Sequence, residues 1–298
     1  MRILISPAMR RLVLGAVFTL ATAAAAGAQD ARERTLYVSV ADDEGTPVTN
    51  IGVQDLIVRE DGARREILRV SRATDPIDIA ILVDDSQAAG PHLVFIRNAL
   101  TQFVEQMRGD NNIAVVGLAQ RPTMLTGYTR DAGRLSAAIG RVFPQTGSGM
   151  TLLDALVELS RGLEKRPGTR AALVGILSDG PEQGRFDDQS VIAAMTKAGA
   201  SFYAATVGRF ADVQSHELRS RSILLSRGTR DTGGRHANMM AASGLPRALR
   251  LIGEDLSSQI KVVYARPDSL IQPESVSVDA ARPGLKARGA PARPRIRP

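Results

Sequence analysis

The apolar run Ile77–Val83 (IDIAILV) restricts the fold more than any other segment, because only one of its seven residues is charged. Such a run is typical of a strand buried on both faces of a parallel sheet. We predict strands at Ile77–Val83, Ile113–Leu118, Thr123–Tyr128 (short and antiparallel), Ala171–Leu177, Ser201–Val207 and Ile260–Tyr264. We predict intervening helices at His92–Met107, Ala132–Val142, Leu152–Leu163, Gln189–Ala198, Val213–Leu225 and Leu245–Leu256. This alternation predicts an α/β fold with a doubly wound, mostly parallel, six-stranded sheet of Rossmann-like type.

Shorter β segments flank this unit. Three strands are predicted before it, at Leu36–Val40, Asp55–Glu60 and Glu66–Val70. Three strands of this size bury too little apolar surface to be stable alone. We expect two strands after the α/β unit, at Ser275–Val278 and Gly284–Arg288, to join them in a small β accessory domain. The predicted organisation is a small β unit at 29–74, an α/β domain at 75–266, C-terminal strands at 267–289 and a basic disordered tail at 290–298.

The first 28 residues have the pattern of an export signal. A basic leader is followed by the apolar run Leu12–Leu20, and Ala26 and Ala28 match the small-residue pattern of a cleavage site. An uncleaved membrane anchor is the alternative, but the 17 apolar or small residues from Leu12 to Ala28 are marginal for a membrane span, and those at the far end are mostly alanine. We therefore expect cleavage after Ala28 and a periplasmic or secreted protein with no later transmembrane span.

The positive charge of the chain lies at its two ends. The 298 residues carry a formal charge of +7. Residues 1–28 hold three Arg and residues 282–298 hold six basic residues, neither with an acidic one, so residues 29–281 carry a net charge of −2. With no Trp and few aromatic residues, we expect no nucleic-acid partner. The basic tail is expected to make at most a weak contact with an envelope surface.

Three loops at one edge of the predicted sheet carry polar residues. Asp84 and Ser86 follow the first strand, Thr151 precedes the helix at Leu152, and Asp179 follows the strand Ala171–Leu177. In an open α/β sheet, ligands bind beyond the carboxyl ends of the strands. Two carboxylates and two hydroxyls there would suit a hard divalent cation such as Mg²⁺. Asp and Thr are also common loop and helix N-cap residues, so a purely structural role is the alternative.

These residues resemble a von Willebrand factor type A domain. The metal-ion-dependent adhesion site of that family has the pattern D-x-S-x-S, a Thr from a second loop and an Asp from a third. Asp84 and Ser86 match the first two positions, Thr151 the loop Thr, and Asp179 the last Asp. Flanking segments, including GMTLLDAL, GILSDG, GGRHANM and IKVVYARP, resemble those of bacterial secreted proteins related to von Willebrand factor A domains.

The resemblance implies a metal site of Asp84, Ser86, Thr151 and Asp179, with Mg²⁺ or Mn²⁺ as the ion and a protein as the partner. One position departs from the pattern, because Ala88 stands where the second Ser is expected. Either water replaces that ligand or the site has lost its metal and the fold is a scaffold. Asp85 lies next to the motif, but its position predicts that it faces the other way.

Enzyme motifs are absent or incomplete in the sequence. The absence of Cys excludes thiolate chemistry and zinc–thiolate sites. The segment beginning at His216 starts like the zinc-protease pattern H-E-x-x-H, but Ser220 stands where the second His is required. We expect His236 to be a loop residue. The sequence therefore predicts an exported, non-enzymatic, protein-binding module. A metal-dependent hydrolase using the same edge and a metal-free structural subunit of an envelope assembly are the alternatives.

Overall fold

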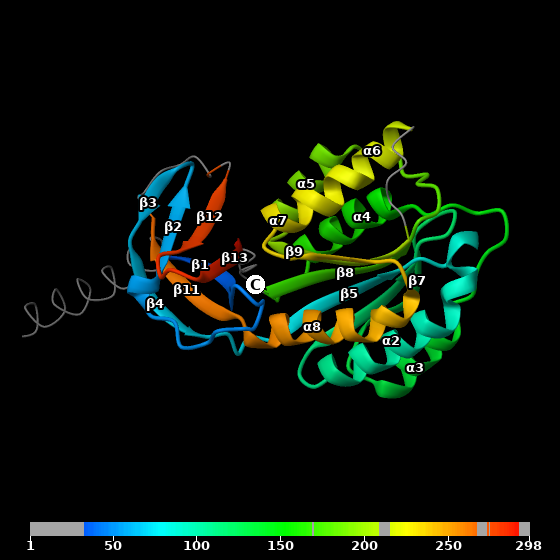
Figure 1. Cartoon of the computed structure of the whole chain (residues 1–298), viewed down its shortest axis with the longest axis horizontal. Coiled ribbons are helices and arrows are strands. Elements are labelled where there is room, and N and C mark those ends of the chain that lie inside the picture. Colours follow the sequence, from blue (N-terminus) through cyan, green and yellow to red (C-terminus); the bar gives the residue numbers. More distant parts are fainter. Residues whose placement is uncertain (1–32, 169, 209–214, 267–272, 274, 292–298) are drawn as a thin grey trace, which may run out of the picture.

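The computed structural model describes residues 33–168, 170–208, 215–266, 273 and 275–291. Figure 1 shows an α/β unit beside a smaller β unit. The predicted export signal lies outside the described residues, as do residues 292–298 of the predicted tail. Among the described residues, no helix is long and apolar enough to cross a membrane.

The α/β unit is built on a six-stranded sheet with the order β10-β9-β8-β5-β6-β7. Its strands are β5 (Ile77–Val83), β6 (Asn112–Gly117), β7 (Thr123–Thr129), β8 (Arg170–Ser178), β9 (Ala200–Val207) and β10 (His236–Met239). All neighbours pair in parallel except β6 and β7, which are antiparallel. Every residue of β5, β8 and β9 is buried. The predicted doubly wound, mostly parallel, six-stranded sheet is confirmed.

Helices cover both faces of this sheet (Figure 1). One face packs against α2 (Leu93–Met107), α3 (Ala132–Gly140) and α8 (Leu245–Ser258). The other packs mainly against α4 (Leu152–Glu164) and α5 (Asp188–Lys197). Shorter helical elements are η1 (Val53–Asp55), η2 (Gln87–His92), α6 (His216–Ile223), the π-helix η3 (Leu224–Gly228), α7 (Thr229–Asp231) and η4 (Ala242–Gly244). Each predicted helix corresponds to an observed one, although part of the predicted helix Val213–Leu225 lies outside the described residues.

The accessory unit consists of two antiparallel sheets around a separate apolar core. The four-stranded sheet has the order β13-β1-β11-β4, and the three-stranded sheet has the order β12-β2-β3. Their strands are β1 (Glu33–Asp42), β2 (Leu56–Glu60), β3 (Ala63–Arg65), β4 (Ile67–Arg72), β11 (Ile260–Ala265), β12 (Val276–Ala280) and β13 (Leu285–Pro291). The C-terminal strands pair with N-terminal ones, β13 with β1 and β12 with β2, as the sequence predicted.

Two strand assignments were wrong. Ile260–Tyr264 was predicted to be the sixth strand of the α/β sheet, but as β11 it lies between β1 and β4 of the accessory unit. The sixth strand is instead β10, which contains His236, the residue predicted to lie in a loop. As an edge strand of four partly exposed residues, β10 has no apolar run to reveal it.

The predicted tail also begins too early. Ala290 and Pro291 belong to β13 and pair with β1. Three basic residues near the C-terminus form ion pairs in the accessory unit or with the α/β unit: Arg282 with Asp55, Lys286 with Asp43, and Arg288 with Asp255. The partly buried pairs of Arg282 and Arg288 therefore help to hold the fold, whereas the pair of Lys286 and Asp43 is exposed on both sides. The other three basic residues, Arg293, Arg295 and Arg297, lie outside the described residues.

The accessory unit lies at the amino ends of the central strands. Arg170, the first residue of β8, donates to Gln259 Oε1 and to the carbonyl oxygen of Asp75, and its guanidinium lies 5.3 Å from the ring centroid of Tyr37 in β1. Gln259 in turn donates to Ser39 Oγ in β1 and to Tyr203 Oη in β9. The carboxyl ends of the parallel strands therefore face away from the accessory unit.

Candidate functional site

Asp84 is the first residue after β5, and its backbone N–H continues the pairing with β8 by donating to the carbonyl oxygen of Ile176 at 2.8 Å. Its side chain is fully buried. One carboxylate oxygen accepts from the backbone N–H of Ser86 at 2.9 Å, and the other accepts from that of Ser178 at 3.0 Å. The carboxylate is thus fixed between two loops, with lone pairs left on both oxygens.

Ser86 lies two residues further on, at the start of η2, and is also fully buried. Its hydroxyl does not cap η2, and Ser86 Oγ has no hydrogen-bond partner within the described part of the chain. Buried hydroxyls without a partner are rare in proteins and require an explanation.

Thr151 directly precedes α4 and is almost fully buried. We expected it at the N-cap position, where the structure places it, but its side chain makes no capping hydrogen bond. Instead Oγ1 donates to the carbonyl oxygen of Leu118, the residue after β6, at 2.8 Å. Because the hydroxyl proton is used in this way, the oxygen keeps its lone pairs for another partner.

Asp179 follows β8 and is exposed, unlike the other three candidates. Its carboxylate lies against Gly208, at the end of β9, where a Cβ atom would come within 2.4 Å of Asp179 Oδ2. Gly208 has a φ of +112°, so both its conformation and its surroundings favour glycine. The next residue, Gly180, packs against the η2 loop, because a Cβ there would lie 2.6 Å from Ala88 Cβ and 3.6 Å from Ser86 Oγ.

Backbone hydrogen bonds join the loops that carry these residues. The N–H of Met150 donates to the carbonyl oxygen of Pro181 at 2.9 Å, and that of Gln183 donates to Met150 at 2.7 Å. Gln145 is bridged to Ser86. The structure therefore brings together the loops of all four predicted residues at the carboxyl edge of the sheet.

Asp85 faces away from this cluster, as its position predicted. Its Oδ1 accepts from the backbone N–H groups of Leu118 and Ala119, each at 2.7 Å. Burial raises the pKa of Asp85, and these hydrogen bonds oppose the shift. The role of Asp85 is to hold the end of β6 against β5.

Glu182 is a buried carboxylate that sequence reasoning missed. Its Oε1 accepts from the N–H of Gly184 at 3.0 Å and lies 3.5 Å from that of Leu153 in the first turn of α4, while Oε2 has no hydrogen-bond partner among the described residues. Burial raises the pKa of Glu182 to about 7, and the positive charge of Arg221 opposes this shift. Glu182 thus lies at the N-terminus of α4, where Thr151 makes no capping bond.

Arg221 is the second residue that the sequence did not reveal. It is buried in α6, and its Nη1 donates to the carbonyl oxygen of Gly180 at 2.6 Å. Burial lowers the pKa of Arg221, opposed by the carboxylates of Glu182, Asp84 and Asp179. One buried cation therefore faces three carboxylates. The only sequence signal was an arginine in a weakly apolar helix, which is normally solvent-exposed.

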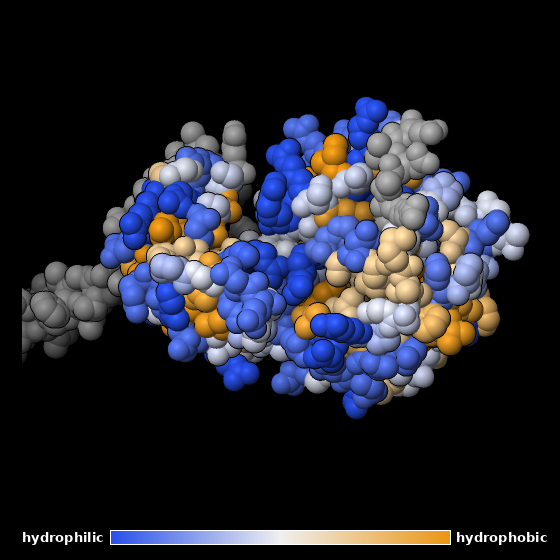
Figure 2. All heavy atoms as spheres, viewed as in Figure 1, coloured by the Kyte–Doolittle hydropathy of each residue, from blue (hydrophilic) through white to orange (hydrophobic). Residues whose placement is uncertain are grey.

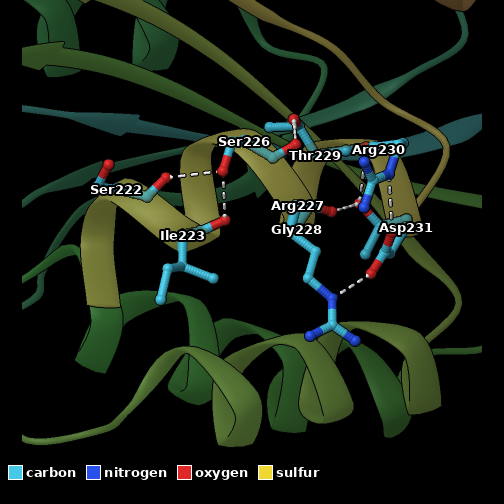
Figure 3. Close-up of polar contacts among 9 residues, drawn as sticks. Ser222, Ile223, Ser226, Arg227, Gly228, Thr229, Arg230 and Asp231 are labelled. Atoms are coloured by element: carbon cyan, nitrogen blue, oxygen red, sulfur yellow. Dashed lines mark hydrogen bonds and ion pairs between the residues drawn. The ribbon is translucent and has the colours of Figure 1, made fainter. Parts of the chain in front are cut away.

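The helix that carries Arg221 continues into the π-helix η3, which Figure 3 shows in close-up. Ser226 Oγ donates to the carbonyl oxygens of Ser222 at 3.0 Å and Ile223 at 3.1 Å. Arg227 and Asp231 form an ion pair one turn apart. Wide turns of this kind are rare and often lie near functional sites.

The residues present fit a hard divalent cation. Asp84, Ser86, Thr151 and Asp179 offer only oxygen donors, the type that Mg²⁺ and Mn²⁺ prefer. The unpartnered Ser86 Oγ is an atom that such an ion would satisfy. Carboxylates alone would not be enough, since the described residues contain no group of three or more His, Cys, Asp or Glu placed to hold a metal.

A comparison of the sequence with known protein families identifies the α/β unit. Residues 79–182 match the family model of the von Willebrand factor type A domain, and this range contains all four candidate residues. The α/β unit is a von Willebrand factor type A domain. The match begins in β5 and ends in the loop after β8, so it spans the strands and loops that build the candidate site of this von Willebrand A domain.

Solved structures with a similar fold share little sequence with this chain. Proximal thread matrix protein 1 from the mussel byssus has a TM-score of 0.50 and 15% identity, covering 63% of this chain and 50% of its own. The von Willebrand domain of the type V pili tip protein Mfa5 from Porphyromonas gingivalis has a TM-score of 0.49 and 12% identity, covering 62% of this chain and 96% of its own. A von Willebrand factor type A protein from Catenulispora acidiphila has a TM-score of 0.49 and 12% identity, with 88% and 73% covered. A comparison with curated protein sequences finds no match.

Proposed function

We propose that the chain is a non-enzymatic protein-binding module whose binding surface is the carboxyl edge of the von Willebrand A domain. Asp84, Ser86, Thr151 and Asp179 would hold Mg²⁺ or Mn²⁺ at this edge. The observation that carries the proposal is Ser86 Oγ, a buried hydroxyl oxygen without a hydrogen-bond partner among the described residues, beside the fixed carboxylate of Asp84.

Hydrogen bonds orient two of these residues for this role. Two backbone N–H groups orient the Asp84 carboxylate, and the carbonyl oxygen of Leu118 takes the Thr151 proton. When bound, the ion would supply positive charge at the surface, to which an acidic group of a partner protein is attracted. Ala88 supplies no oxygen, so a water would complete the coordination, as Mg²⁺ readily accepts.

The charges of the neighbouring residues agree with a divalent ion. The single positive charge of Arg221 is opposed by the carboxylates of Glu182, Asp84 and Asp179, so this cluster carries more negative than positive charge. Two negative charges at this position match the charge of one Mg²⁺ or Mn²⁺ ion.

Calorimetric titration with Mg²⁺ and Mn²⁺ tests the metal site. We expect the wild-type protein to bind, Asp84→Asn to lose binding, and Asp110→Asn, an exposed Asp in the turn before β6, to bind like the wild type. A metal concentration of 100 times the Kd should also stabilise the wild type by about 2.7 kcal/mol. Equal absence of heat in all three proteins at millimolar metal would overturn the metal-dependent form and leave a metal-free surface.

The enzymatic alternative is tested on the same proteins. Turnover of a panel of phosphoesters and peptides that is lost in Asp84→Asn would favour a hydrolase at this edge, and we expect no turnover. A structural subunit of an envelope assembly would instead co-purify with other envelope proteins at constant stoichiometry, with or without metal.

We also propose that the chain is exported to the periplasm or beyond, with residues 1–28 as the signal. The supporting observation is the basic leader, apolar run and small residues at Ala26 and Ala28. N-terminal sequencing of the protein from its native host should begin at Gln29. A protein that still begins at Met1 and is found in the membrane fraction would show an uncleaved anchor.

A further inference from the structure

Large hydrophobic side chains are exposed beside the candidate site. Seven large hydrophobic residues are exposed in the described part of the chain, and four of them lie at the carboxyl edge of the sheet or on the first turn of α2. These four, which we call the apolar patch, are Val94 (78% exposed), Phe95 (40%), Phe143 (58%) and Met240 (66%). Figure 2 shows tan and orange atoms gathered at the end of the α/β unit that faces away from the accessory unit.

Contacts with α2 bring the patch together. Val94 and Phe95 lie in its first turn. One turn later, Arg97 donates to the carbonyl oxygen of Val142 at 2.7 Å, and its guanidinium lies 4.2 Å from the ring centroid of Phe143. η4 also packs against α2, and Met240 lies two residues before η4. The four residues therefore lie in α2 and in segments that contact it, and α2 follows the loop of Asp84 and Ser86 through η2.

The segments that form the patch carry only positive charges. The segments that form it, residues 87–98, 141–150 and 236–247, contain no Asp or Glu. They contain Arg97, Arg141 and Arg247, and none of these three forms an ion pair with a described residue. Arg141 and Arg247 are exposed. An apolar centre with a charged rim is the usual anatomy of a protein-binding surface, and complementary charge selects the partner.

We infer that the apolar patch binds a partner-protein segment that presents apolar side chains flanked by acidic residues. The apolar side chains of the segment cover Phe95, Phe143 and Met240, and its carboxylates face Arg141 and Arg247. This inference rests on the proposed protein-binding function and adds to it the place and the chemistry of the contact.

Two other occupants fit the patch less well. A second copy of this chain would bring two arginine rims together with no acidic residue in either set of segments. An anionic membrane is normally recognised by clusters of about four to eight basic residues, and this patch has three arginines, one of which is stacked on Phe143.

A random peptide library displayed on phage tests the inference. The library is selected on the wild-type chain in 1 mM Mg²⁺, and the enriched peptides are measured against four variants. Phe95→Ser/Phe143→Ser removes the centre of the patch, Arg141→Glu/Arg247→Glu reverses its rim, and Asp84→Asn disrupts the candidate metal site. Leu68→Ser is the matched control, because Leu68 is exposed to a similar extent (38%) on the accessory unit. Circular dichroism confirms that each variant is folded.

We expect the enriched peptides to combine apolar and acidic residues. Their affinity should fall about tenfold or more in Phe95→Ser/Phe143→Ser and stay within twofold in Leu68→Ser. Selection on Arg141→Glu/Arg247→Glu should enrich basic peptides in place of acidic ones. These results together support the inference.

Other outcomes overturn it. Peptides without apolar and acidic enrichment, equal binding to Phe95→Ser/Phe143→Ser, or no enrichment on the wild type each exclude the patch as the contact. Binding of phosphatidylglycerol vesicles at 0.15 M salt that is lost in Phe95→Ser/Phe143→Ser would assign the patch to a membrane, and concentration-dependent dimerisation lost in that variant would assign it to a second copy. Affinity lost only in Asp84→Asn would exclude the patch but retain the proposed function at the metal site, which the calorimetric titration judges separately.

Discussion

Replacing Glu182 by Gln should remove a pH dependence from the stability of the protein. Glu182 is 6% exposed, and its Oε2 has no hydrogen-bond partner among the described residues. Gln keeps the oxygen that accepts from Gly184 but cannot ionise. The change therefore isolates the cost of a buried negative charge at the N-terminus of α4.

The magnitude follows from the pKa of this carboxyl. Burial raises the pKa of Glu182 from 4.5 to about 7 in the folded protein. Below pH 4.5 the group is protonated in both the folded and the unfolded state and does not affect their balance. Between pH 4.5 and 7 it ionises only in the unfolded state, which favours unfolding. The rise of this pKa from 4.5 to about 7 corresponds to roughly 3 kcal/mol of stability lost over this range, and the loss is constant above pH 7.

Urea denaturation followed by far-UV circular dichroism measures this loss, since the chain has no Trp for fluorescence. The buffers contain EDTA so that metal binding does not contribute. Between pH 4.5 and 7.5 the wild type should lose about 3 kcal/mol more than Glu182→Gln. Glu158→Gln, an exposed glutamate on α4, should behave like the wild type. The slopes are compared rather than the absolute stabilities, because Gln also removes a counter-charge of Arg221. Parallel slopes for wild type and Glu182→Gln would refute the reasoning.

Three further changes test the site and the fold. Ala88→Ser supplies the hydroxyl missing from the family pattern, and we expect Mg²⁺ affinity by calorimetry to rise about tenfold, or 1.4 kcal/mol; unchanged affinity would show that position 88 does not face the ion. Arg288→Ala leaves the buried carboxylate of Asp255 without its ion-pair partner, which should cost about 3 kcal/mol in urea denaturation, and a loss below 1 kcal/mol would contradict this. Gly234→Ala would place a Cβ atom 1.8 Å from a backbone carbonyl oxygen of β9, whereas the Cβ atom of Gly109→Ala would meet open space. We expect Gly234→Ala to lower the stability of the fold by about 3 kcal/mol or more and Gly109→Ala to leave it unchanged. Similar melting temperatures for the two variants would exclude the clash.

Most of the candidate site could be predicted because it depends on strand ends. Asp84 directly follows one apolar run, and Asp179 follows another after a single serine. Parallel strands bring their carboxyl ends to one edge of the sheet. Arg221 and Glu182 could not be found in this way. Glu182 lies in a loop beside Met150 through backbone pairing, and Arg221 reaches Gly180 from a helix more than 40 residues away in sequence. Such contacts leave no local pattern.

The sequence alone determined the type of each strongly apolar element. Periodicity reports whether a segment is buried on one face or on both, and this was enough to predict the α/β fold and the pairing of N- and C-terminal strands in an accessory unit. The tertiary structure decided which sheet each strand joins. Ile260–Tyr264 has enough apolar residues for a parallel sheet, yet as β11 it pairs antiparallel with β1 and β4. His236–Met239 has few apolar residues and still completes the central sheet beside β9. Strand pairing uses backbone hydrogen bonds that every sequence offers, so the partner is chosen by long-range packing and not by the composition of the strand itself.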